Sequence, residues 1–133
     1  MALHLLTQAA RDVALGQISL SGFAALLDRQ ERVCQEQLAA VTAFEIPEDL
    51  RHETAEEMAL GLAGIHHMLV SLETLRGYLT DRRLPVLEEG LEQAREATEL
   101  LNKALECNWT SYYAFKESME EYLTQLGPGG PAV

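Results

Sequence analysis

The adjacent pair His66-His67 contains the residues whose types could most directly do chemistry. Imidazole binds transition metals and can carry protons or covalent intermediates near neutral pH. On a helix, two consecutive residues point about 100° apart, whereas ligands that share a metal are spaced by three or four residues. The positions at that spacing are occupied by Leu62, Ala63, Gly64, Leu69, Val70 and Ser71, which leaves no Glu-x-x-His pattern of the di-iron type. We therefore expect no metal site and no cofactor, and keep a metal-binding helical bundle as a second alternative.

The same histidines could instead serve in phosphotransfer. The segment His67-Met68-Leu69-Val70-Ser71 resembles the His-x-Leu-Lys-Gly-like motif of histidine phosphotransfer (HPt) domains, which are acidic four-helix bundles of about this length. The resemblance implies that His67 would accept the phosphoryl group. The sequence departs from the motif at Val70, which replaces a lysine that would steady the phosphate. An HPt-like signalling domain is the first alternative function.

Two further groups of residues could bind a protein partner. One is an acidic row spaced along one side of a helix, which suits a basic helix or tail: Glu88, Glu92, Glu96, Glu99 and Glu106. The other combines apolar, small and aromatic residues that could form an interface: Leu60, Gly64, His66, His67, Val70, Trp109 and Tyr113. An acidic row of this kind is usually a solvated face, and Trp109 and Tyr113 could equally belong to the core.

Several classes of function lack their sequence signals. There is no glycine-rich phosphate loop, no G-x-S-x-G and no cysteine–histidine nucleophile pattern, so we expect no catalytic residues. The net charge of −11 repels phosphate backbones and disfavours nucleic acid. The longest apolar stretch, residues 58–72, is shorter than the roughly 20 residues of a membrane span. With no signal-peptide pattern at the N-terminus, we expect a cytoplasmic protein without a membrane segment.

Helical periodicity runs through nearly the whole chain, and no alternating strand pattern occurs. With 133 residues, 47% of them hydrophobic, the chain can build one core. The sequence predicts an all-α, up-and-down antiparallel bundle of four to five helices in one domain, residues 1–126. The segment 127–133, rich in glycine and proline, reads as a flexible tail.

Turn and capping signals divide this domain. The first helix should cover about residues 3–15 and stop at Gly16, with Ser19 or Ser21 capping a second helix that ends near residue 44. The third should start at Pro47, or alternatively at Thr54, and continue to about residue 79. The fourth should begin near residue 84 and bend or break near residues 108–111, where Asn, Thr and Ser weaken helix propensity.

The third helix is apolar or small on every side between Met58 and Val70. A helix of that kind must be covered all round, yet each helix of a four-helix monomer keeps one face towards water. We therefore expect a homodimer that pairs through the spare face of this helix. The expected function is a non-catalytic protein–protein interaction module, such as an adaptor, chaperone or regulatory subunit, with an unidentified and possibly basic partner.

Overall fold

The computed structural model describes residues 2–43, 48 and 51–125, with side chains described at 3–43, 48 and 55–104. The described chain is helical and contains no strand. Its elements are α1 (Ala2–Ala14), α2 (Leu20–Ala43), α3 (Arg51–Arg76), the single turn α4 (Tyr78–Asp81) and α5 (Leu84–Gln125). The predicted all-α bundle is thereby confirmed.

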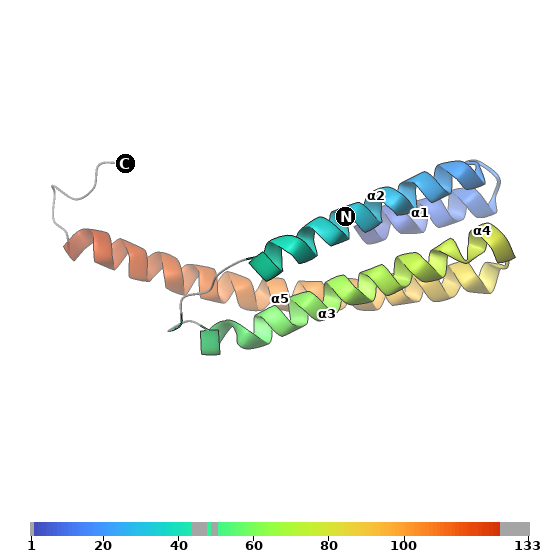
Figure 1. The fold of residues 1–133 in the computed structure, drawn as a ribbon. Coiled ribbons are helices and arrows are strands. Elements are labelled where there is room, and N and C mark those ends of the chain that lie inside the picture. Colours follow the sequence, from blue (N-terminus) through green and yellow to red (C-terminus); the bar gives the residue numbers. More distant parts are fainter. Residues whose placement is uncertain (1, 44–47, 49–50, 126–133) are drawn as a thin grey trace.

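Two antiparallel hairpins make up this bundle, as Figure 1 shows. The α1–α2 hairpin lies against the longer hairpin formed by α3 and α5, and successive long helices alternate in direction. Going round the bundle, α1 contacts α2 and α5, while α3 contacts the same two helices from the other side. The helix α3 is therefore one corner of the bundle rather than its enclosed centre.

The turn between α1 and α2 follows from two residues that the sequence singled out. Gly16 has φ of 72°, the left-handed conformation in which a residue without a Cβ ends a helix at little cost. The Ser19 hydroxyl then accepts a hydrogen bond of 3.0 Å from the Gly22 N–H and caps the start of α2. Both predicted signals are confirmed.

The other helix ends differ in part from the prediction. As described, α3 begins at Arg51, between the two candidate starts, while Pro47 lies outside the described residues. The helix ends at Arg76, and the one-turn α4 then closes at Arg82, a non-glycine residue with φ of 57°. This sharp end reverses the chain, so that α5 returns along α3 from Leu84 (Figure 1).

The helix α5 is continuous from Leu84 to Gln125, which corrects the expected break near residues 108–111. Asn, Thr and Ser each cost only about 0.5–0.7 kcal/mol relative to alanine within a helix. Such penalties do not stop a helix that has no proline or glycine at that point. Its 42 residues span about 63 Å, against about 39 Å for the 26 residues of α3.

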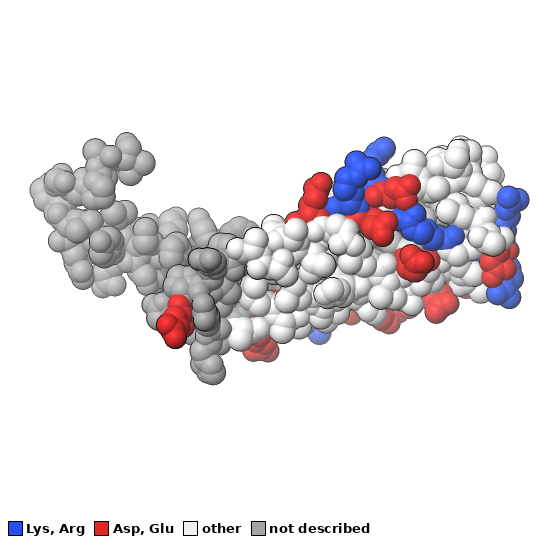
Figure 2. All heavy atoms as spheres, viewed as in Figure 1, with Lys and Arg blue, Asp and Glu red and all other residues white. Residues whose placement is uncertain are grey.

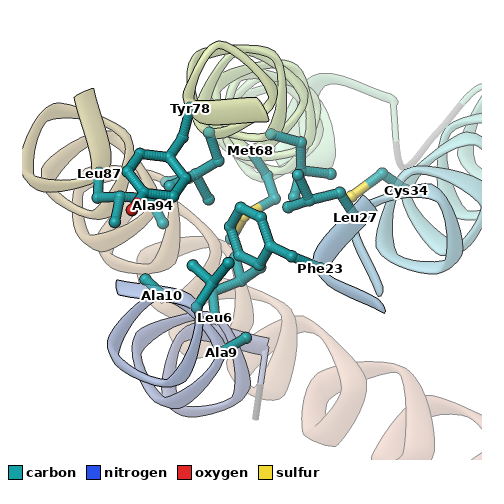
Figure 3. Packing of buried hydrophobic residues seen from close by; sticks show 14 of the residues in the cluster. Leu6, Ala9, Ala10, Phe23, Leu27, Cys34, Met68, Tyr78, Leu87 and Ala94 are labelled. Atoms are coloured by element: carbon teal, nitrogen blue, oxygen red, sulfur yellow. The ribbon is translucent and has the colours of Figure 1, made fainter. Parts of the chain in front are cut away.

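The core lies where all the long helices meet, towards the α4 end of the molecule (Figure 3). Leu6 of α1, Phe23 and Leu27 of α2, and Leu72 and Leu75 of α3 are almost completely buried. Full burial of such a side chain stabilises the fold by roughly 1.5–3 kcal/mol. The ring of Phe23 meets that of Tyr78 edge to face at 6.4 Å between centroids, which joins α2 to α4.

Small residues let α3 and α5 approach each other closely. A Cβ on Gly90 would lie 2.5 Å from Cδ2 of Leu75, and one on Gly64 would lie 2.7 Å from Cγ of Leu101. Between these two contacts the buried Ser71 hydroxyl donates a hydrogen bond of 2.8 Å to the Gly90 carbonyl. The α3–α5 hairpin is therefore the most tightly fitted part of the described structure.

Candidate interaction surface

The outward side of α3 carries an exposed face without charged residues. We call it the outer face of α3 and define it by the exposed residues Ala59, Ala63, His66 and Val70. Val70 is 50% exposed, although valine is usually buried. No Lys, Arg, Asp or Glu occurs in residues 58–72, and Figure 2 shows the corresponding area over α3 as largely white. The described residues therefore leave this face uncovered.

The other candidate interface residues on α3 do not share that exposure. Gly64 is buried against Leu101 of α5, so it lies on the inner side of α3 and not on its outer face. Helical periodicity could not reveal which side of the apolar helix would meet α5. Leu60 is half-buried on the side nearer to α5. The candidate residues Trp109 and Tyr113 have side chains outside the described set.

The two histidines separate, as their neighbouring positions on a helix require. His66 is exposed on the outer face of α3, whereas His67 is half-buried beside α5. The Nε2–H of His67 donates to the Glu96 carboxylate at 2.9 Å, a contact between residues 29 positions apart in sequence. A phosphoryl group on that nitrogen would meet a carboxylate of like charge. Among the described residues, no three His, Cys, Asp or Glu side chains gather into a group that could hold a metal ion.

The acidic row of α5 is exposed as a continuous side of the helix, but most of its described members already have partners. Arg95 forms ion pairs with Glu92 and with Glu99, while Glu96 binds His67. The hydrogen bond from Arg95 lowers the pKa of Glu92. Glu88 is exposed as well, and the side chain of Glu106 lies outside the described set. A basic partner would therefore compete with Arg95 for this row.

Sequence periodicity missed the ion pairs of Arg76. This residue ends α3, and its guanidinium binds Asp28 and Glu31 of α2. The hydrogen bond to Asp28 is the main cause that raises the pKa of Arg76. The residue type was the available signal, because a charged residue at the edge of a core needs a partner on the next helix. These pairs hold α2 against α3 and leave the outer face free.

By length and composition, one helical stretch among the described residues could cross a membrane. It runs over Ala55–Asp81, beyond the apolar stretch 58–72 considered in the sequence, and contains an 18-residue window with a mean hydropathy of 1.3. Of that window, 33% is buried inside the bundle. The core helix of a soluble protein meets the same criteria of length and composition, and Leu72 and Leu75 of this stretch are core residues.

Comparison with known proteins adds no guide to function. No protein-family model, no curated protein and no solved structure matches this chain. The basis for a functional proposal is therefore the surface of the molecule itself.

Proposed function

We propose that this chain is a non-catalytic protein–protein interaction module of the cytoplasm, which binds an amphipathic helix of another protein. The observation that carries the proposal is the exposed, charge-free outer face of α3. Exposed apolar surface on a helical bundle is typical of binding sites. A long apolar helix with one exposed side is consistent with an adaptor, chaperone or regulatory role.

A helix is the partner that fits this face best. Ala59 and Ala63 lie one turn apart and present small side chains, which lets another helix come close to the backbone of α3. Val70 supplies a larger apolar contact two turns further on. Grooves and faces of this kind bind helices through apolar residues spaced by three and four positions.

The charges around the face favour a partner with basic residues at its edges. Glu56 and Glu73 are exposed and border the uncharged stretch at its two ends. The whole molecule carries a net charge of −11, which attracts basic partners and speeds their encounter with the face. The apolar centre would then supply affinity, while the acidic border would orient the bound helix.

The test is affinity purification from native lysate with a matched pair of variants. Ala63→Arg places a charge in the centre of the outer face, and Ala25→Arg places the same charge on the exposed side of α2. We expect the first variant to lose its partner and the second to retain it, with circular dichroism showing equal helicity. Retention of every captured protein by Ala63→Arg would show that the outer face is not the binding surface.

A further inference from the structure

The core has one end that the described residues leave partly exposed. Burial along α3 and α5 is nearly complete at Leu72, Leu75, Ala94 and Ala97. Further from α4 the same rows become half-buried, and Val33 of α2 is 41% exposed. We call this region the uncovered end and define it by Val33, Leu38 and Val41 of α2 together with Leu101 of α5. Leu38, Val41 and Leu101 still pack against the core cluster.

The cause is the short length of α1. This helix lies between α2 and α5 but has only 13 residues, whereas α2 has 24. About 11 residues of α2, roughly 16 Å, therefore continue without α1 beside them. Figure 1 shows α1 alongside only the half of α2 that is nearer to α4. As the fourth helix of the bundle, α1 thus covers only about half of the length of α2.

At its C-terminal end, α5 extends past the helix that packs against it. Gly64 lies beside Leu101 and Gly61 beside Ala104, so each step along α3 is matched by an equal step back along α5. Continuing this register places Arg51, the first residue of α3, level with residue 114 of α5. The 11 residues 115–125, about 16 Å of helix, then extend past α3, as Figure 1 shows. None of the described residues of α3 lies beside this segment.

The sequence of this projecting segment is amphipathic. Helical periodicity puts Phe115, Met119 and Tyr122 on one face. The charged residues Lys116, Glu117, Glu120 and Glu121 fall on the remaining sides. The segment therefore has the pattern of a helix that packs one side into a bundle.

We propose that residues 115–125 of one copy fill the uncovered end of a second copy, and that the second copy does the same in return. The uncovered region and the projecting helix match in length at about 16 Å. Both belong to the same molecule, and both lie at the end away from α4. The exchange completes a four-helix arrangement in each copy and forms a closed, two-fold dimer.

Charge permits contact at this place and opposes contact through the charged surfaces of the molecule. Two copies that each carry −11 repel each other wherever their charged surfaces meet. Residues 37–43 of α2, at the uncovered end, contain no charged residue. The apolar face of 115–125 approaches this neutral surface, while its glutamates stay on the solvent side. This dimer leaves the outer face of α3 free, so it is independent of the function proposed above.

The area available is also sufficient for a dimer. A buried aromatic residue removes about 150–250 Å² from water, and the segment contributes Phe115 and Tyr122 besides Met119 and Leu123. Because the contact occurs twice, the total reaches the roughly 1,200–2,000 Å² of a stable interface.

The experiment compares three full-length proteins: wild type, Met119→Glu and the control Thr124→Glu, which puts the same charge on the opposite face of the segment. Sedimentation equilibrium at micromolar concentrations should give a dimer for wild type and control. Met119→Glu should raise the dimer Kd about tenfold or more, because it buries an unpaired charge. Position 119 lies past the level of Arg51 in the register of α3 and α5, so helicity by circular dichroism should change little.

Hydrogen exchange supplies the second measurement, because it reports on the segment itself. In the wild-type dimer, the amides of residues 115–125 should be protected, and this protection should disappear on dilution to monomer. A wild-type monomer at all micromolar concentrations would overturn the proposal, as would a dimer that Met119→Glu leaves intact or whose residues 115–125 exchange freely. The function proposed above fails on a different result. If the outer face of α3 is not the binding surface, Ala63→Arg still captures every partner, and the dimer is unaffected.

Discussion

Among the described glycines, Gly90 is the one whose added Cβ would make the shortest contact. Substituting alanine for a glycine inside a helix normally stabilises it by about 1 kcal/mol. Here the new Cβ would meet the fully buried Leu75, with Cδ2 at 2.5 Å and the backbone nitrogen at 3.3 Å. Overpacking of this kind costs about 1–3 kcal/mol, so we expect Gly90→Ala to lower the free energy of unfolding measured with urea.

The control for this substitution lies on the opposing helix. A Cβ on Gly61 would meet only the Cβ of Ala104, at an ordinary 3.9 Å. Gly61→Ala should therefore leave the free energy of unfolding unchanged or raise it by up to about 1 kcal/mol. Equal effects at the two positions would contradict the close approach of α3 and α5 at Gly90.

Arg76 tests how α2 is held against α3. Methionine keeps the length and apolar stem of the side chain but removes the pairs with Asp28 and Glu31. Because both carboxylates are more than a third exposed, we expect Arg76→Met to cost only about 1 kcal/mol at low salt. Arg83, which pairs with Asp81 and is 71% exposed, provides the comparison. Arg83→Met should have no measurable effect on the urea midpoint.

At the scale of the helices, the described ends of α1 and α4 are each followed by a residue in the left-handed conformation. Glycine suits that conformation, and it is present after α1 but not after α4. Gly16 adopts φ of 72°, while Arg82 adopts φ of 57°. Left-handed geometry costs a residue with a Cβ about 1–2 kcal/mol. We expect Gly16→Ala to lower the thermal midpoint and Arg82→Gly to raise it. Changes of the same sign in both variants would contradict this account of the helix ends.

Sequence patterns predicted most of the helices because their signals are local. Gly16 and Ser19 mark a turn within four residues of each other, and the buried residues Phe23, Leu27 and Cys34 lie at helical spacing along α2. The break in α5 was predicted wrongly because weak propensity near residue 108 was given more weight than the continuing apolar pattern.

The candidate site was harder to predict, since it depends on which helix faces which. Periodicity showed that α3 was apolar all round but could not tell that Gly64 would face Leu101. The contact between His67 and Glu96 joins residues far apart in sequence, so no spacing rule could anticipate it. Exposure of His66 and Val70 likewise follows from the arrangement of the bundle.

For the whole molecule, the net charge of −11 gives the two proposed contacts opposite responses to salt. Raising the ionic strength from 0.01 M to 0.15 M shortens the Debye length from about 30 Å to about 8 Å. Repulsion between two copies is then screened, so we expect the dimer Kd to fall in sedimentation experiments. Binding of a basic partner to the acidic border of the outer face should weaken over the same range. If salt instead dissociated the dimer, the dimer would depend on attraction between opposite charges, which would contradict the proposed contact through uncharged residues.

The close fit between α3 and α5 also bears on how the chain folds. These helices are neighbours in sequence, joined only by the short α4 turn, so their contact closes a small loop at little entropic cost. We therefore expect this hairpin to be the folding nucleus, onto which α1 and α2 assemble later. Alanine substitutions at Leu75 should slow refolding, whereas those at Leu6 should mainly accelerate unfolding in stopped-flow measurements.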